Sequence, residues 1–442
     1  MSAPTVLAQS SAPRPPGSAT RSPYGRPHRP RPARVVAPEL RVSDTPAAVV
    51  LRAVVQRGPV SRDVIVSATG ISTATVNRHV SALIAAGLLR ERADLSTSGA
   101  VGRPRVPVEV DHEGQCTLGV HIGATTTRIV AVDLRGTVLG GVEIATPSGP
   151  HAGALRSIAE SAASFAARWH RRRILFVGVA IGGRVNVQKG TVDHPRLAWS
   201  DAPVGAVLGE RLGAVVAVAP HVEAMAASEL LLATESAPED AGRPEAGGSV
   251  GGRPGTSLYF YAREMTGLAL TIDGRVHTPA GGPGSIAHLP TGSDAVCDCG
   301  RTGCLEATVS DRAVVAAAQR AGLLEESERS IAAVYLAART GSTVAQGLLN
   351  DRADALGRAL ALVHDVVNPD SVQVGGQAFT AYPAAMERVE AAFESSSSVA
   401  TSRRVRVTSF GKRVQDHAAA AVSLGSLYAD PVVTMRKIDA QR

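Results

Sequence analysis

The sequence contains few aromatic residues, few cysteines and no long apolar run. Aromatic side chains make up 3% of its 442 residues, so the core must be built from Ala, Val, Leu and Ile. Four cysteines in a chain of this length exclude a disulfide scaffold. No apolar run approaches the length of a membrane-spanning helix, and the Ser-, Pro- and Arg-rich N-terminus lacks the apolar segment of a secretory signal. We therefore expect a cytoplasmic protein without membrane contact.

Lysine is absent from the first 110 residues, yet they are strongly basic. They hold fifteen Arg against six acidic residues, whereas the remainder holds thirty-one basic and thirty-three acidic residues. A basic segment on a near-neutral body indicates a polyanion partner at one end only. Phe, Tyr and Trp are also missing from residues 45–110. This excludes a stacking platform for single strands and favours duplex DNA.

The composition divides the chain into four segments. Residues 1–43 are rich in Pro and Arg and are expected to be a disordered basic tail, either inert or adding phosphate contacts. Residues 44–110 form a unit of their own, discussed next. Residues 111–430 alternate Val- and Ile-rich runs with Ala-rich helical runs, which is typical of an α/β fold, and 234–256 is expected to be a disordered insertion. Residues 431–442 are expected to be a tail. Within the α/β segment we expect strands at 117–121, 128–132, 175–181, 257–262 and 371–374 and a helix at 221–232.

Residues 61–87 predict a helix-turn-helix. A first helix over 61–69 is followed by Gly70 at the turn, and Ser72 is suited to cap a second helix that ends before Gly87. Apolar side chains recur on the second helix at helical spacing and predict a buried stripe; they are Val76, Val80, Leu83 and Ile84.

The opposite side of that second helix is small and polar, and it carries one Arg. Such a face fits a major groove, which is about 12 Å wide. The plain alternative is an ordinary amphipathic helix. The face consists of Ala74, Thr75, Arg78, Ser81 and Ala82, with Asn77 beside it. We take Ser72, Thr75, Asn77 and Arg78 as candidate DNA contacts.

The residues after Gly87 predict a strand, an irregular polar stretch and a second strand, which is the layout of a wing. Arg90, Arg92, Arg103 and Arg105 make this wing basic. Arg103 and Arg105 lie in an extended Gly-Arg-Pro-Arg stretch that suits a narrow minor groove. Residues 44–110 therefore predict a winged helix-turn-helix that binds duplex DNA.

Three cysteines crowd into eight residues, with a histidine upstream. Cys297, Cys299, Cys304 and His288 match a closed tetrahedral Zn²⁺ site. Such a site has no open coordination position, so the metal is expected to be structural. The alternative is three unrelated reduced cysteines.

Three motifs resemble the ROK family (repressors, open reading frames, sugar kinases). The most specific is Cys-x-Cys-Gly-x-x-Gly-Cys-Leu-Glu at 297–306; Gly-Ser-Ile-Ala-His at 284–288 and Val-Gln-Val-Gly-Gly-Gln at 372–377 match two others. The resemblance covers nearly everything from residue 43 to 425. It implies an actin/hexokinase-like fold with two α/β lobes around a cleft, where family kinases bind sugar and ATP. An N-terminal winged helix is what family repressors carry and family kinases lack.

The resemblance does not extend to the kinase chemistry. His221 replaces the family's catalytic Asp, and Pro220 replaces the sugar-binding Asn before it. The phosphate loop has lost its Asp and Lys at 121–126, and Ala124 obstructs close backbone approach. The second glycine-rich turn, at 265–269, keeps one of three glycines. We expect no enzymatic activity and assign no catalytic residue.

The family's sugar ligands are also partly replaced. Ser285 stands for a Glu and Arg196 for an Asn, whereas His288 and Glu306 are retained. The changes make the pocket more cationic, which would suit a phosphorylated or acidic ligand. Glu306 has a second interpretation, which is to orient the zinc loop, and a regulator without any small ligand is a further alternative. The candidate effector ligands are Arg196, His221, Glu223, Ser285, His288 and Glu306.

Taken together, these features predict a DNA-binding transcription regulator, a repressor, that responds to a sugar or phosphosugar. The two-fold symmetry of duplex sites favours a homodimer or homotetramer on a palindrome. Two alternatives remain open at this point, namely a sugar kinase with an appended regulatory domain and a zinc-stabilised protein-interaction module.

Overall fold

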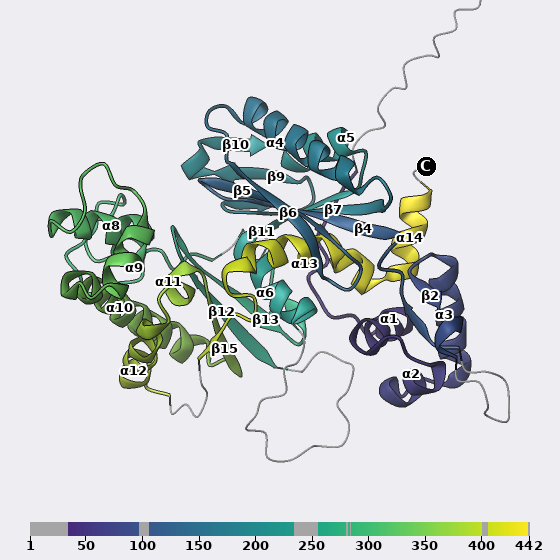
Figure 1. The fold of residues 1–442 in the computed structure, drawn as a ribbon. Helices are drawn as coiled ribbons and strands as arrows, with labels where there is room; N and C mark the ends of the chain where they lie inside the picture. The colour runs from purple at the N-terminus through teal and green to yellow at the C-terminus, as the bar shows by residue number, and fades with distance from the viewer. Residues whose placement is uncertain are drawn as a thin grey trace, which may run out of the picture. The chain divides into compact units, whose positions relative to one another are not determined.

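The computed structural model describes residues 34–96, 106–233, 255–279, 282, 284–399 and 405–440, drawn as a ribbon in Figure 1. Most of the expected N-terminal tail, nearly all of the expected insertion, and the wing residues Arg103 and Arg105 lie outside these ranges. We call residues 44–110 the head and residues 111–440 the body. The head holds a two-stranded sheet, and the body holds two larger sheets and a small one.

The described residues of the head form three α-helices, a short 3₁₀ helix (Ala93–Leu95) and an antiparallel strand pair. Gly70 ends the second helix at φ +69°, in the left-handed region that glycine favours. Ser72 precedes the third helix and accepts a hydrogen bond from the backbone N–H of Thr75 at 3.4 Å. The strands pair in a register that places Leu89 opposite Val110. The elements are α1 (Pro46–Arg57), α2 (Arg62–Thr69), α3 (Thr73–Ala85), β2 (Leu89–Glu91) and β3 (Val108–Val110).

The buried stripe predicted for the third helix is confirmed. Val76, Val80 and Leu83 are fully buried, and Ile84 packs against the same cluster at its edge. The helix-turn-helix and the two wing strands lie where the sequence predicts them.

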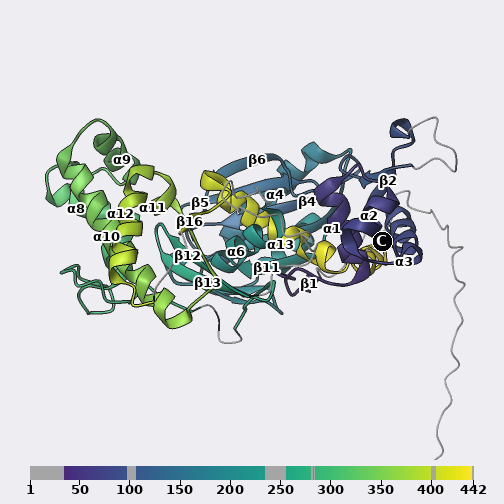
Figure 2. The same cartoon turned by 90° about the horizontal axis from the view of Figure 1, so that it is seen from below.

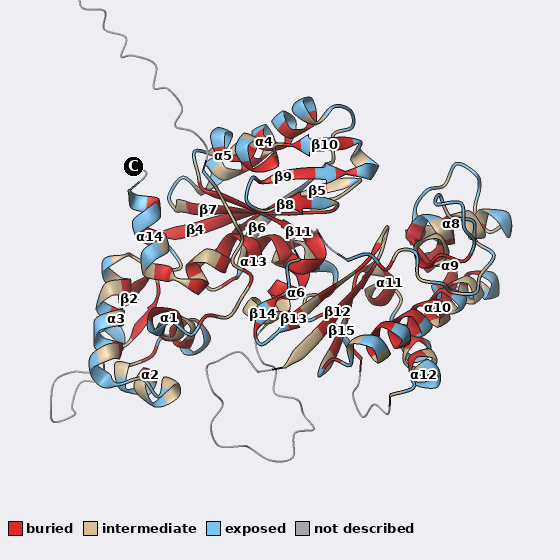
Figure 3. Cartoon of the chain, turned by 180° about the vertical axis from the view of Figure 1, so that it is seen from behind, coloured by how far each residue is buried: buried red, intermediate tan, exposed pale blue. Residues whose placement is uncertain are grey.

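The first lobe of the body is a six-stranded sheet in the order β1-β11-β7-β4-β5-β6. Helices α4 and α5 cover one face, and α13 covers the other, as Figure 3 shows. Strand β5 pairs antiparallel with both β4 and β6, whereas β4, β7, β11 and β1 run parallel. The bounds are β1 (Val35–Val36), β4 (Gln115–Ile122), β5 (Thr126–Val132), β6 (Val138–Ala145), β7 (Arg173–Ile181), β11 (Val216–Pro220), α4 (His151–Ala166), α5 (Val204–Leu212) and α13 (Val414–Ala429).

Glycines in the strands allow α13 to approach this sheet closely. A Cβ at Gly178 of β7 would lie 2.1 Å from the backbone nitrogen of Ser423, and one at Gly119 of β4 would lie 2.9 Å from Ala419. Helix α13 is therefore placed by backbone contact. It packs against β4 and β7 of the first sheet and against α6 (His221–Leu232), which lies beside it in Figure 2.

The second lobe is a five-stranded sheet in the order β14-β13-β12-β15-β16. Helix α6 covers one face, while α10 and α12 pack on the other around Phe260, Phe379 and Phe393. The bounds are β12 (Thr256–Ala262), β13 (Thr266–Ile272), β14 (Arg275–Val276), β15 (Ser371–Gly375), β16 (Arg406–Val407), α10 (Thr343–Val367) and α12 (Met386–Ser396). The remaining elements are the small sheet β8 (Arg184–Asn186), β9 (Thr191–His194) and β10 (Trp199–Ala202), with α7 (Leu305–Val309), α8 (Asp311–Arg320), α9 (Ile331–Arg339), α11 (Gln377–Thr380) and α14 (Pro431–Asp439).

The mixed α/β, two-lobed fold class is thereby confirmed. Each strand predicted in the body lies within, or coincides with, β4, β5, β7, β12 or β15, and the predicted helix is α6 to the residue.

Two predicted tails are wrong at their boundaries. Residues 34–43, which we call the linking segment, are ordered: Val35 and Val36 add a parallel strand to the open edge of β11, and Val42 donates to the carbonyl of Gly274 at 2.8 Å. The open sheet edge supplies hydrogen-bond partners that composition alone does not reveal. The expected C-terminal tail contains helix α14, whose Met435 is buried against the body.

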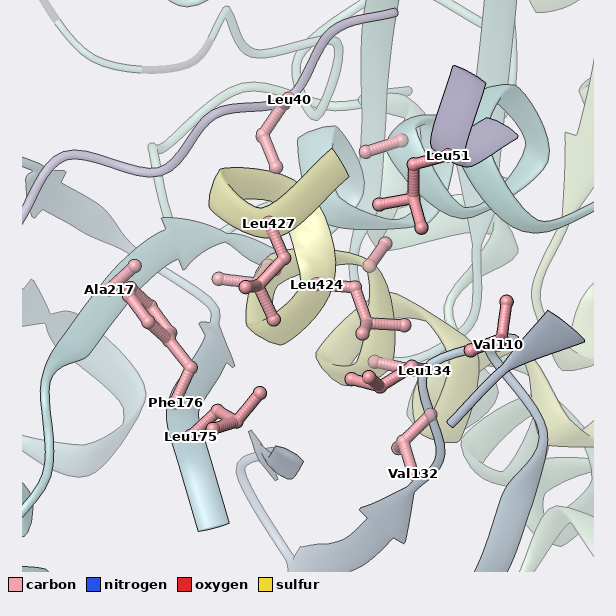
Figure 4. Close-up of a cluster of buried hydrophobic side chains, with 14 of the residues drawn as sticks. Leu40, Leu51, Val110, Val132, Leu134, Leu175, Phe176, Ala217, Leu424 and Leu427 are labelled. Carbon is pink, nitrogen blue, oxygen red and sulfur yellow. The ribbon is translucent and has the colours of Figure 1, made fainter. Parts of the chain in front are cut away.

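The head and the first lobe share one apolar core, shown in Figure 4. Leu51 of α1 and Val110 of β3 belong to the same buried cluster as Leu424 and Leu427 of α13. Helices α1 and α13 are therefore in direct packing contact.

Within the described residues, no single helix is long and apolar enough to cross a membrane. One helix pair, Gly411–Ala429 with Pro431–Asp439, passes the same length and composition test together but is bent by 100° between its halves.

Candidate functional site

Helix α3 presents a polar face to solvent. Ser72, Asn77 and Arg78 are exposed, and the helix contains no acidic residue. In the described part of the chain, the Arg78 guanidinium makes neither a hydrogen bond nor an ion pair. Burial and the charge of Arg78 lower the pKa of His79, so Arg78 carries the charge of this helix near neutral pH. The face that the sequence singled out is exposed and cationic.

Ser72 and Thr75 have a structural task in this geometry. The Ser72 hydroxyl accepts from the backbone of Thr75 at 3.4 Å and donates to the Thr75 hydroxyl at 3.0 Å. Both side chains therefore help to begin α3, and Thr75 is half-buried.

The wing is less basic than its sequence indicates. Arg90 pairs with Glu109 at 2.7 Å and with Glu113 at 2.6 Å, and Arg92 pairs with Asp94 at 2.6 Å and with Glu109 at 3.0 Å. The register of β2 with β3 places Arg90 directly opposite Glu109. Arg90 and Arg92 are thus paired with acidic side chains of the head and of the start of the body. The other two arginines of the predicted wing, Arg103 and Arg105, lie outside the described residues.

The four predicted metal ligands come together. The sulfur atoms of Cys297, Cys299 and Cys304 and a ring nitrogen of His288 all lie within 4.8 Å of one another. Cys299 Sγ is 3.7 Å from Cys304 Sγ, and Cys297 Sγ is 3.7 Å from His288 Nδ1. Zn–S bonds of about 2.3 Å place the sulfurs of a tetrahedral site about 3.8 Å apart. The donor set and its spacing therefore fit a zinc ion.

The cysteine loop is tied to the rest of the body by Glu306. Its Oε1 accepts from Nη2 of Arg196 at 2.7 Å, and its Oε2 accepts from the backbone N–H of Thr266 at 3.1 Å. Two of the predicted effector ligands thus neutralise each other, so a ligand that uses either one must compete with this ion pair.

A pocket opens between the lobes, at the ends of β4, β11 and β12. His121 and His221 form its floor, with ring centroids 5.8 Å apart and planes at 8°. Burial holds the pKa of His121 well below its usual range and lowers the pKa of His221 to about 4. Both rings are neutral near pH 7. The lining side chains include His121, Ala124, His194, Arg196, His221, Tyr261, Arg263, Glu264, Met265 and Gln415.

The β4–β5 turn, which corresponds to the family's phosphate loop, is closed on itself. The backbone N–H of Gly123 donates to the carbonyl of Thr126 at 2.9 Å, and the Gly123 carbonyl accepts from the Thr146 hydroxyl at 2.8 Å. A phosphate therefore finds the Gly123 N–H already engaged.

The remaining predicted effector ligands lie away from the pocket wall. Glu223 is buried in α6 and is not among the lining residues; burial raises its pKa to about 7. Ser285 is exposed and accepts from the backbone of Ala287 at 3.3 Å. His288 belongs to the metal cluster. Of the six candidates, only Arg196 and His221 line the pocket directly.

Sequence reasoning missed several lining residues. Tyr261 and Arg263 come at the carboxyl end of β12, and Gln415 comes from the first turn of α13. Their signal is positional: side chains at the carboxyl ends of strands in α/β sheets face the ligand crevice. Using this signal requires the order of the strands in the sheet, which the sequence alone does not give.

A family model described as "ROK family" matches residues 117–240 and 250–426. Among curated proteins, "Transcriptional regulator Rv0485" of Mycobacterium tuberculosis (strain ATCC 25618 / H37Rv) is 53% identical over 427 residues, covering 94% of this chain and 93% of that protein. A "Putative xylose repressor" of Caldicellulosiruptor is 26% identical, covering 74% and 82%.

Solved structures share the fold. A ROK family transcriptional regulator described as a homolog of the E. coli MLC protein superposes with a TM-score of 0.71 at 22% identity, covering 89% of this chain and 98% of its own. A ROK family glucokinase from Streptomyces griseus, in complex with glucose and AMPPNP, gives 0.56 at 23% identity, covering 70% and 99%. The regulator thus accounts for a larger share of the chain than the kinase does.

Proposed function

The chain belongs to the ROK family, and on that premise we propose that it is a DNA-binding transcription regulator, a repressor, with no phosphoryl-transfer activity. The observation that carries the proposal is the exposed face of α3, which contains no acid and whose Arg78 has no ion-pair partner among the described residues. The 53% identity to a named transcriptional regulator supports it over nearly the full length.

In this proposal α3 enters the major groove. Arg78 reads a base edge, Asn77 contacts a neighbouring base or phosphate, and Ser72 and Thr75 hold the start of the helix against the backbone. Arg103 and Arg105 would add contacts in the minor groove. Because a palindromic duplex has two-fold symmetry, a homodimer or homotetramer would present two copies of α3. Such a regulator acts on the chromosome, in the cytoplasm.

Selection from a random pool of duplexes tests this function without knowledge of the target genes. Purified protein should enrich one sequence with inverted half-sites, spaced about one helical turn apart. Its affinity should fall steeply with salt, because phosphate contacts release counterions. Failure to enrich any sequence at moderate salt would remove the proposal.

The pocket supports binding better than catalysis. A general base works best when its pKa lies near the operating pH, and the pKa of His221 is about 4. The Gly123 N–H is engaged, and Arg196 is paired with Glu306. With ATP and any of several hexoses, the protein should release no ADP above background. Hexose-dependent ADP release that His221→Ala abolishes would instead favour the kinase alternative.

We propose that the same pocket holds the effector, a sugar or phosphosugar. Arg196 and His221 would contact it directly. Glu306 would respond to it, because a ligand anion that engages Arg196 competes with the Glu306 carboxylate. Glu223, Ser285 and His288 do not line the pocket, so they would affect the ligand only indirectly, through the residues that contact it. Release of Glu306 would loosen the cysteine loop from β13, which provides a path from ligand to lobe arrangement.

The metal cluster would hold a structural Zn²⁺ through His288, Cys297, Cys299 and Cys304. Four protein ligands leave no position for a substrate or water. The ion would stiffen the loop that precedes α7, and thereby the position of Glu306.

A further inference from the structure

A second cavity lies between the head and the body. Its walls come from the linking segment, α1, the end of α6 and α13. They mix apolar and polar side chains, and the apolar ones include Leu51 and Val55 of α1 and Leu230 and Leu231 of α6. Leu230 and Leu231 are only half-buried although they face the interior side of this junction. The polar lining residues are Arg41, Ser43, Arg52 and Gln56, together with Tyr428, whose hydroxyl donates to the carbonyl of Leu134.

Arg52 is the unusual member of this lining. Its Nη1 donates to the carbonyl of Ser43 at 3.0 Å, but its Nε and Nη2 are buried without a hydrogen-bond partner among the described residues. Burial lowers the pKa of Arg52, and the charge of Asp44 offsets this only in part. The other arginine of the lining, Arg41, is paired with Glu39. A guanidinium edge removed from water without a partner is costly.

The same edge is satisfied elsewhere in this chain by carboxylates. Arg128 donates from Nε and Nη2 to the two oxygens of Asp416 at 2.9 and 2.8 Å. Arg388 does so to Asp354 at 2.7 and 2.6 Å. The parallel N–H groups of this edge match the two oxygens of a carboxylate. Arg52 lines the cavity, and no acidic side chain among the described residues hydrogen-bonds its Nε or Nη2.

We propose that this cavity is a second ligand site, which binds a small carboxylate that carries a short hydrocarbon chain. The carboxylate would take both free donors of Arg52, and the chain would lie along Leu51, Leu230 and Leu231. A single negative charge would match Arg52, the one lining guanidinium that keeps unpartnered donors among the described residues. A phosphate dianion would bring a second charge against the apolar walls, so the chemistry favours a monocarboxylate.

The site would be coupled to DNA binding, because its walls belong to different parts of the chain. Arg52 lies on α1, which packs with α3 in the head, whereas Leu230 and Leu231 belong to the body. The two free nitrogens are covered, so a carboxylate reaches them only if α1 or the linking segment shifts or the Arg52 side chain turns. A ligand that favours the shifted arrangement changes how the head is held on the body.

Calorimetric titration of the full chain with hexanoate tests the site. Acetate keeps the carboxylate without the chain, and 1-hexanol keeps the chain without the carboxylate. We expect hexanoate to bind saturably at one per chain, and both controls to bind roughly tenfold more weakly or worse. Absence of saturable hexanoate binding to folded protein would overturn the proposal.

Two variants remove the site in different ways. Arg52→Gln removes the paired donors, and Val55→Phe fills the cavity while leaving Arg52 in place. Both should lose hexanoate binding by roughly tenfold or more, whereas Arg57→Gln, on the exposed end of the same helix, should not. Hexanoate affinity that is unchanged in both folded variants would place its binding elsewhere and refute the assignment.

A second readout measures the coupling. Hexanoate should change the affinity of the wild-type chain for a selected duplex by about fivefold or more, and Arg52→Gln should abolish that change. If hexanoate binds at Arg52 without altering duplex affinity, the coupling is refuted but the ligand site itself stands. Because the titration needs no DNA, the site stands or falls independently of the proposed regulator function.

Discussion

Glu223 offers a sharp test of how the interior between the lobes is built. Its side chain is 2% exposed in the first turn of α6, and Oε2 has no hydrogen-bond partner among the described residues. Burial raises its pKa from an ordinary value of 4.5 to about 7, against a smaller opposing effect of a hydrogen bond with Thr278. The carboxyl is thus protonated in the folded protein at a pH where the unfolded chain has already ionised it.

The sign of the pH dependence follows. Below pH 4.5 both states hold the proton, so Glu223 carries no penalty. As the pH rises to about 7 only the folded state holds it, and stability falls, with the full loss present above pH 7. A shift of this size corresponds to about 3 kcal/mol, of which about 2–3 kcal/mol develops between pH 5 and pH 8. Glu223→Gln keeps the shape without the titration and should be more stable at pH 8 by that amount.

The measurement is the free energy of unfolding from urea titrations at pH 5 and pH 8. His221 acts in the opposite direction. Because its pKa is lowered to about 4, the stability of the folded protein falls as the pH drops below 6.5. His221 is present in both proteins, so the comparison cancels its effect. Glu210→Gln, on the exposed side of α5, is the matched control and should follow the wild type. If Glu223→Gln and the wild type lose equal stability from pH 5 to pH 8, Glu223 is not held as a buried acid.

Three further predictions concern the metal, the packing of α13 and the pocket. Metal analysis should find about one zinc per chain, lost in Cys299→Ser but retained in Cys116→Ala; a folded, zinc-free wild type would contradict the cluster. Gly178→Ala should lower the free energy of unfolding by about 3 kcal/mol, because its Cβ would meet the backbone of Ser423 at 2.1 Å. The control Gly153→Ala, in open space on α4, should raise the free energy of unfolding by up to about 1 kcal/mol. Equal effects of the two variants would refute the close approach of α13 to β7. Glu306→Gln removes the ion pair with Arg196 and should therefore strengthen the binding of an anionic sugar ligand severalfold, as measured by calorimetry. An unchanged affinity would mean that the Arg196–Glu306 pair is not part of the ligand site.

Features set by nearby residues could be read from the sequence. The buried stripe of α3 and the Ser72 cap depend on spacings within one helix. The four metal ligands lie within seventeen residues of one another, so their grouping needs no knowledge of the fold. Helix α6 matches the helix-like segment that the sequence shows directly before a low-complexity stretch.

Features set by distant partners could not be read in this way. Arg196 and Glu306 are 110 residues apart, and only the fold brings them to 2.7 Å. Arg90 counts toward a basic wing in the sequence, but the strand register places Glu109 opposite it. The linking segment reads as a tail because its ordering depends on the open edge of β11, not on its own composition.

The central claim is that α3 reads duplex DNA through Arg78. The most direct test measures the affinity of wild type, Arg78→Ala and Arg156→Ala for the selected duplex and for a scrambled one. If Arg78 reads a base, Arg78→Ala should lose about 1–3 kcal/mol on the selected duplex and much less on the scrambled one. Arg156→Ala removes the same charge from the exposed surface of α4 and should bind both duplexes like the wild type. Equal losses for Arg78→Ala on both duplexes would reduce Arg78 to a phosphate contact, and no loss on either would contradict the account.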